Sequence, residues 1–415
     1  MTMTTSEHSS PAGCMQHHHV GPLSIYIDRY AFRLVKEGYR QSSVWRYSRL
    51  TADFSLWLEL YRIDVCDLDE KVVARYLADR ANQRSRQSGD RAALKKLLEV
   101  LRDVDVIAPQ APTELSACER HFADFADYLA RELGLVPGTI ASHRSTVRLF
   151  LQEEGVLSTG DFTRLDQAVV IGFVERHAND HSPGATRHMC SSLRAFLRYL
   201  RWNGWITLDL AGSVPTVRRW RQATLPTYLS AEQVQQVLDG CNRQCAVGRR
   251  DFAILMLLAR LGLRANEVAT LTLDDFDWRS GQVLINGKGR QRTPMPLPRD
   301  IGTAITDYLR DGRPKSDSRR LFLRDAVPHV GFATPGSIFK VANSALRRAG
   351  IKGFAHMGAH LFRHSLATEL LRAGASLTEI GQLLRHRHHD TTRLYAKVDI
   401  DMLRRVSPGW PGDVR

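Results

Sequence analysis

The sequence lacks an apolar run long enough to cross a membrane, and no secretory leader is visible at its start. Its six cysteines are scattered, and the one close pair, Cys241 and Cys245, has no second pair of matching spacing. A zinc site is therefore not expected, and the cysteines are better explained as buried thiols or as thiols without a function. These absences predict a cytoplasmic protein with reduced thiols and no membrane partner.

An acidic excess is also missing. Lysine and arginine number 58 against 44 aspartate and glutamate residues, which gives a net charge of +14 and a pI near 9.8. This balance favours a polyanionic partner, with nucleic acid as the first candidate, although charge alone fits any basic soluble protein. With 415 residues, 43% of them hydrophobic, the chain can form two or three domains without covalent staples.

Composition and periodicity divide the chain into five parts. Apolar residues recur at spacings of three and four over most of the first half, which is the pattern of amphipathic helices. Pro137-Gly138 and Ser182-Pro183-Gly184 punctuate this helical region. The predicted parts are a flexible tail (1–21), a first helical module (22–112), a second helical module (113–214), a basic linker (215–226) and a final domain (227–415).

The two helical modules share a pattern that suggests an internal repeat. Leu68 to Val73 resembles Leu165 to Val170 at an offset of 97 positions (165 − 68). Matches upstream and downstream drift slightly from this offset, as small loop insertions would produce. The alternative is that any two amphipathic helical bundles share such patterns. We favour two copies of one module, because identity, order and spacing agree, and a different helix connectivity would contradict this hypothesis.

The final domain opens with a helix signal and contains one β-hairpin. Ser230 and Gln233 have the spacing of a capping box, and an apolar helix is predicted from Phe252 to Leu261. Residues 282–285 and 293–297 predict two short strands around a glycine-rich turn. The prolines in the second strand cannot donate ladder hydrogen bonds, so it should be short and lie at an edge. The remainder is predicted to be mainly helical.

Four segments of this domain carry side chains suited to chemistry. They are Gly262-Leu263-Arg264-Ala265-Asn266-Glu267-Val268, Gly287-Lys288-Gly289-Arg290, His360-Leu361-Phe362-Arg363-His364, and Leu383-Leu384-Arg385-His386 with Thr391-Thr392-Arg393-Leu394-Tyr395-Ala396. Phosphodiester transfer passes through a state with two negative oxygens, which planar guanidinium groups hold without a metal ion. A tyrosine nucleophile needs nearby positive charge and an imidazole to take its proton, because its reference pKa is about 10. The leaving oxygen needs a proton donor such as lysine.

These segments resemble the tyrosine recombinase, or phage integrase, family. The family pattern is Arg in a G-L-R-x-x-E context, Lys on a hairpin turn, H-x-x-R-H, L-L-G-H and a terminal T-T-x-x-Y. The resemblance covers roughly Leu229 to Val406, and 24 positions separate Arg264 from Lys288 (288 − 264). A single H-x-x-R is weak evidence, whereas four segments in order at the family's separations are strong evidence.

The resemblance implies a fold and a reaction. The fold is mainly α with a small β-sheet: SAM-like helical core-binding modules precede a mixed α/β catalytic domain, and together they form a C-shaped clamp on DNA. The reaction is site-specific cleavage and rejoining of DNA through a 3′-phosphotyrosyl bond to Tyr395. Because that bond keeps the energy of the cleaved one, no ATP, metal ion or other cofactor is expected. The implied partners are double-stranded DNA and, at synapsis, a homotetramer or related recombinases.

The resemblance also implies a role for each matching residue. Arg264 and Arg363 would clamp the scissile phosphate, and His360 would accept the proton of the tyrosine nucleophile. Lys288 would protonate the leaving 5′-oxygen, and His386 would hold the phosphate by a hydrogen bond.

Two neighbours of these residues have alternative interpretations. Glu267 lies one helical turn after Arg264 and either supports it or forms a surface ion pair of little worth. His364 shares a helical face with His360 at a spacing that also suits metal ligands. No glutamate lies between them, and Arg363 beside them would repel a cation. No metal site is therefore predicted, and His364 is expected to be a packed, hydrogen-bonded side chain.

One position departs from the family pattern. Arg385 stands where the family has glycine before the later histidine. If the backbone there has a positive φ, arginine strains it. If not, Arg385 is available for a further phosphate contact.

Three other functions fit part of the pattern. A type IB topoisomerase shares the tyrosine chemistry, but the H-x-x-R-H segment and the compact spacings favour a recombinase. A DNA-binding protein on a catalytically inactive recombinase fold is disfavoured, because all six expected side chains are present. A metal-dependent nuclease would need a divalent cation and would leave no covalent adduct.

Overall fold

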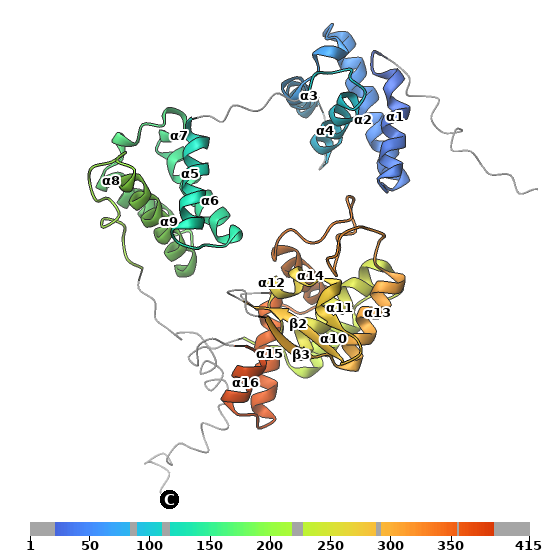
Figure 1. Ribbon diagram of the computed structural model, residues 1–415, viewed down its shortest axis with the longest axis vertical. Helices are drawn as coiled ribbons and strands as arrows, with labels where there is room; N and C mark the ends of the chain where they lie inside the picture. The colour runs from blue at the N-terminus through green and yellow to red at the C-terminus, as the bar shows by residue number, and fades with distance from the viewer. Residues whose placement is uncertain are drawn as a thin grey trace, which may run out of the picture. The chain divides into compact units, whose positions relative to one another are not determined.

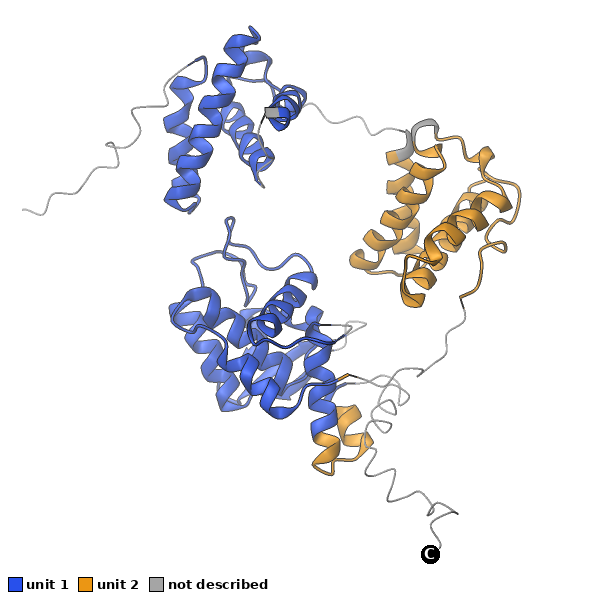
Figure 2. Cartoon of the chain, turned by 180° about the vertical axis from the view of Figure 1, so that it is seen from behind, with its two compact units in different colours: residues 1–112, 228–369, 383–385 blue, residues 113–227, 370–382, 386–415 orange. Residues whose placement is uncertain are grey.

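The described part of the protein is mainly helical, with one small three-stranded sheet, and this confirms the predicted fold class (Figure 1). The computed structural model describes residues 21–83, 89–109, 117–217, 227–287, 292–354 and 357–385. Two compact units divide the chain, one with residues 1–112, 228–369 and 383–385, the other with residues 113–227, 370–382 and 386–415 (Figure 2). Within the described residues, no helix has both the length and the apolar character needed to cross a bilayer.

The first helical module is built around its own core. Its elements are α1 (Ser24–Lys36), α2 (Gln41–Leu60), a 3-10 helix (Val65–Asp67), α3 (Glu70–Gln83) and α4 (Asp90–Arg102). The buried cluster extends from Leu23 to Ile107 along the chain. Tyr30 is buried within it, and its hydroxyl donates to the backbone oxygen of Ala93 at 2.8 Å, which ties α1 to α4.

The second helical module has a separate core. Its elements are α5 (Ala117–Arg131), α6 (Pro137–Glu153), α7 (Val156–Thr159), a 3-10 helix (Phe162–Arg164), α8 (Gln167–Ala178) and α9 (Pro183–Trp202). Pro137 and Pro183 begin α6 and α9, where a missing N–H breaks no helical hydrogen bond. Ser182 caps α9 by accepting from the backbone N–H of Ala185. The punctuation seen in the sequence therefore marks helix starts.

Both modules have the same order of elements, apart from the added α7. In each, the first helix packs on the second and fourth, and the fourth also packs on the second and third. Asp69 Oδ1 accepts from Val72 N, and Asp166 Oδ1 accepts from Val169 N, both at 2.8 Å. These two caps are 97 positions apart (166 − 69), the offset found in the sequence. The shared connectivity supports the hypothesis of a repeat.

The final domain combines helices with the sheet. Its elements are α10 (Ala231–Asp239), α11 (Ala246–Arg260), α12 (Ala265–Thr270), a 3-10 helix (Leu273–Asp275), β1 (Phe276–Asp277), β2 (Gln282–Asn286), β3 (Arg292–Pro296), α13 (Arg299–Asp311), α14 (Gly336–Arg348), α15 (Ala359–Arg372) and α16 (Leu377–Leu383). The order is β1-β2-β3, with both pairs antiparallel. Pro294 and Pro296 lie in the edge strand β3, as predicted, whereas the two-residue strand β1 was not predicted.

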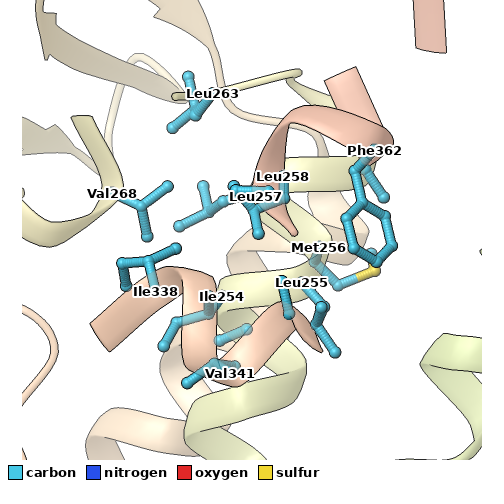
Figure 3. Close-up of a cluster of buried hydrophobic side chains, with 14 of the residues drawn as sticks. Ile254, Leu255, Met256, Leu257, Leu258, Leu263, Val268, Ile338, Val341 and Phe362 are labelled. Atoms are coloured by element: carbon cyan, nitrogen blue, oxygen red, sulfur yellow. The ribbon is translucent and has the colours of Figure 1, made fainter. Parts of the chain in front are cut away.

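Helix α11 forms the centre of this domain's core. Its residues 254–258 are all buried, and they lie in one cluster with side chains such as Ile338 and Val341 (Figure 3). Leu263, Val268 and Phe362 belong to the same cluster. Since these apolar residues are next in sequence to Arg264, Glu267 and Arg363, the core fixes the backbone that carries the candidate site. The predicted capping box of α10 is also present, between Ser230 and Gln233.

Candidate active site

Arg264 lies at the N-terminal end of α12, directly after the core residue Leu263. Gly262 before it has a φ of +59°, and a Cβ there would lie only 2.7 Å from Leu384 Cδ2, so only glycine makes this turn without strain. The backbone N–H of Arg264 donates to Glu267 Oε2 at 2.8 Å, which caps the first turn of the helix. The G-L-R-x-x-E spacing therefore has a local structural basis: turn, core anchor and cap.

Glu267 binds two guanidinium groups. Its Oε1 accepts from Arg264 Nη1 at 2.7 Å, and its Oε2 accepts from Arg385 Nη2 at 2.8 Å. Its side chain is only 3% exposed, so the surface ion pair considered above does not describe this contact. Burial by itself would raise the pKa of the Glu267 carboxyl, but the charges and hydrogen bonds of Arg385 and Arg264 outweigh burial and lower it.

Arg363 lies in α15 and is buried. Its Nη1 donates to the backbone oxygen of Gly262, and its Nη2 donates to that of Leu384. Arg264 Nη2 donates to the neighbouring oxygen of Arg385 at 3.4 Å. The two predicted clamp arginines therefore both hold the turn at Leu384 and Arg385.

Helix α15 also carries His360 and His364, whose ring centroids are 6.4 Å apart. Desolvation lowers the pKa of His360, and repulsion from Arg363 and Arg264 lowers it further. The lowered pKa favours the uncharged imidazole, which can accept a proton. His364 is half-buried, and burial together with His360 and Arg363 lowers its pKa to about 4.

The departure at Arg385 takes the first of the two forms considered above. Its φ is +52°, a left-handed conformation that costs a residue with a Cβ about 1–3 kcal/mol. The side chain is 9% exposed and is held by Glu267. Its Nη1 contacts Met295 Sδ and donates to the backbone oxygen of Leu383 at 3.3 Å. The arginine is thus a buried partner of Glu267.

The described residues bring together five of the predicted side chains: Arg264, Glu267, His360, Arg363 and His364. Lys288, His386 and Tyr395 lie outside the described residues, as do residues 1–20 of the predicted tail and residues 218–226 of the predicted linker. Sequence reasoning missed the pairing of Arg385 with Glu267. The replaced glycine was the one signal that marked the position.

Two protein-family models match the chain. The phage integrase family matches residues 227–401, and the phage integrase N-terminal SAM-like domain matches residues 122–204. The putative integrase/recombinase y4rA of Sinorhizobium fredii is 40% identical over 400 residues, which cover 95% of this chain and 96% of that protein. Tyrosine recombinase XerC of Oceanobacillus iheyensis is 28% identical over 302 residues, which cover 70% of this chain and 95% of that protein.

Solved structures share the fold. The XerH site-specific recombinase bound to its palindromic difH substrate gives a TM-score of 0.51 at 17% identity, covering 71% of this chain and 97% of that one. A lambda integrase dimer bound to a COC′ core site gives a TM-score of 0.50 at 12% identity, covering 66% of this chain and 94% of that one. The expected combination of a SAM-like helical domain and an integrase catalytic domain is confirmed.

Proposed function

The chain belongs to the phage integrase family of tyrosine recombinases, and we propose that it cleaves and rejoins double-stranded DNA through a covalent bond to Tyr395. It is a site-specific recombinase. What we propose is which residues carry out its reaction, the covalent intermediate they form and the number of protomers that assemble on DNA. The observation that carries the proposal is the buried carboxylate of Glu267, which holds Arg264 close to Arg363 and His360. A phosphate at Arg264 would meet a guanidinium that is oriented before DNA arrives.

Cleavage would proceed by in-line attack on the phosphorus. Arg264 and Arg363 would neutralise the two non-bridging oxygens. His360, uncharged at neutral pH, would take the phenolic proton of Tyr395 while the phenolic oxygen bonds to phosphorus. The bond from phosphorus to the 5′-oxygen would break, and Lys288 would supply the proton that this oxygen needs.

Rejoining would reverse the same steps with a 5′-hydroxyl from another strand. His386 would hold the phosphate in place by a hydrogen bond during both steps. The number of phosphoester bonds is unchanged by the cycle, so the reaction needs no ATP. Because guanidinium groups supply the positive charge, the proposed mechanism also uses no metal ion.

The assembly is inferred from the family and from its structural neighbours. XerH and lambda integrase are described as bound to their DNA sites, and lambda integrase is described as a dimer. We infer that the second helical module (113–214) and the catalytic domain (227–415) hold opposite faces of a duplex through its phosphates. Four protomers would join two sites, and sedimentation of the covalent complex measures that number.

The first helical module (22–112) would be a second copy of the SAM-like module. Its support is the shared element order, the shared helix contacts and the equivalent caps of Asp69 and Asp166. We infer that this extra module contacts DNA beyond the core site.

The covalent intermediate can be trapped with nicked duplex DNA. The purified chain is incubated in EDTA with nicked duplexes that tile the DNA flanking its coding sequence, and products are separated on a denaturing gel. We expect a DNA-linked protein band from the wild type and none from Tyr395→Phe. Tyr61→Phe, at an exposed tyrosine of the first module, should still give the band.

Each contrary result identifies a different function. An adduct that persists in Tyr395→Phe would show that another residue is the nucleophile. Binding of DNA with no adduct would favour a catalytically inactive DNA-binding protein. Cleavage that needs a divalent cation would indicate a nuclease, and relaxation of supercoils by a monomer would indicate a topoisomerase.

A further inference from the structure

We propose that Arg385 is a positioning residue of this active site. Its guanidinium binds one oxygen of Glu267, so the negative charge of Glu267 does not neutralise Arg264, and Arg264 keeps its positive charge for the scissile phosphate. This inference rests on the proposed function, because it assigns a cause to the phosphate affinity of Arg264. The family pattern given above has glycine at this position, and this chain has arginine.

The two oxygens of Glu267 are divided between two arginines. Arg264 Nη1 lies 2.7 Å from Oε1, and Arg385 Nη2 lies 2.8 Å from Oε2. One carboxylate thus faces two guanidinium groups, and the three side chains carry a net charge of +1. If Arg385 were uncharged, Glu267 and Arg264 would form a neutral pair, and a phosphate approaching Arg264 would feel the nearby carboxylate.

Burial determines which of the three side chains can present the net positive charge to a phosphate. The side chains of Glu267 and Arg385 are 3% and 9% exposed, whereas that of Arg264 is 32% exposed. Of the three groups, Arg264 is therefore the one that a phosphate can reach. The Nε atom of Arg385 is buried and has no hydrogen-bond partner in the described part of the chain. A guanidinium in such a place persists because its charge is paired.

The backbone at Arg385 links it to both clamp arginines. The carbonyl of Leu384 accepts from Arg363, and the carbonyl of Arg385 accepts from Arg264. The left-handed φ of Arg385 directs these two consecutive carbonyls, and the Glu267 pair holds the side chain of the same residue. His386 follows in the chain. Arg385 therefore fixes the geometry of the clamp as well as its charge.

The test compares two variants that keep the same backbone strain. Arg385→Gln removes the charge, and Arg385→Lys retains it. Arg250→Gln is the matched control, because Arg250 is an 11% exposed side chain paired with Asp251 at 2.8 Å in the same domain. Covalent cleavage of the nicked duplex is measured in single turnover at saturating DNA, and the melting temperature of every variant is recorded.

We expect Arg385→Gln to slow covalent cleavage at least tenfold, with most of the rate restored in Arg385→Lys. Arg250→Gln should keep the rate within threefold of wild type, even where its melting temperature falls as far. Three results overturn the proposal: a rate for Arg385→Gln within twofold of wild type, an equal loss in Arg250→Gln, or no recovery in Arg385→Lys.

A second measurement keeps this inference separate from the proposed function. Orthovanadate, a phosphate analogue, is titrated against the DNA-free protein by isothermal calorimetry. Arg385→Gln should weaken its binding at least fivefold, and Arg250→Gln should not. If the wild type forms no DNA adduct, the proposed function fails while this titration still decides the role of Arg385. Unchanged affinity in Arg385→Gln, or no saturable binding by the wild type, overturns that role.

Discussion

His364 links the ionisation of the candidate site to the stability of the fold. Its pKa falls to about 4, because burial, His360 and Arg363 all disfavour the charged ring. In the unfolded chain a histidine has a pKa of about 6.5. Between these values the unfolded chain binds a proton that the folded chain does not. The stability from the uncharged ring is therefore complete above about pH 6.5 and declines as the pH falls towards 4.

Replacing His364 should remove this decline. We expect His364→Gln to flatten the loss of stability between pH 7 and pH 5, with a full effect of up to about 3 kcal/mol by pH 4. The free energy of unfolding at each pH is measured by urea titration, with hydrogen exchange of α15 peptides as the readout. A slope unchanged in His364→Gln would show that other groups cause it.

The sequence predicted which residues form the site, but it did not predict which side chains they bind. Arg264, Arg363 and His360 could be named because the family pattern fixes their spacing. The bond between Arg385 and Glu267 joins residues 118 positions apart, and neither periodicity nor a local motif reports on such a contact. The half-burial that lowers the pKa of His364 likewise depends on packing that the sequence does not display.

Among the elements of the catalytic domain, the turn between α11 and α12 determines where the site residues lie. Gly262 combines a positive φ with close approach to Leu384 and Leu366, and its carbonyl accepts from Arg363. The hairpin and α11 were predicted because strand alternation and an apolar helical run are local signals. Strand β1 was not, because two residues become a strand only by pairing with β2.

The cost of this close approach can be measured against a second glycine. Gly281 also has a positive φ, +63°, but a Cβ there would meet nothing within 4 Å. Gly281→Ala should lower the free energy of unfolding by about 1–2 kcal/mol, the cost of the left-handed backbone alone. Gly262→Ala should cost roughly twice as much and should slow covalent cleavage, because its carbonyl positions Arg363. Equal costs in denaturant titrations would show that the close approach is relieved without effect.

At the scale of the whole molecule, the buried residues that the structure describes form three clusters, one in each helical module and one in the catalytic domain. The SAM-like family model matches residues 122–204, and the shared element order extends the same architecture to the first module. Under the proposal that the first module contacts DNA, it would add to the DNA-contacting surface of the chain.

Removing the first module should therefore shorten the protected DNA and leave the chemistry intact. We expect a chain that begins at Thr113 to form the covalent adduct but to protect a shorter stretch of duplex from DNase. The slope of log affinity against log salt concentration should become shallower by about 1 for each phosphate that the shorter chain no longer binds. Identical footprints and slopes would show that this module serves another partner.

The carboxylate that Arg264 and Arg385 share also couples substitutions at positions 267 and 385. An arginine at position 385 places a Cβ at a left-handed φ and buries a charge, and Glu267 is the carboxylate that pairs with this charge. Once the arginine is present, losing Glu267 would leave two guanidinium groups without their counter-ion. Replacing Glu267 should therefore destabilise this chain more than it would a variant with glycine at position 385.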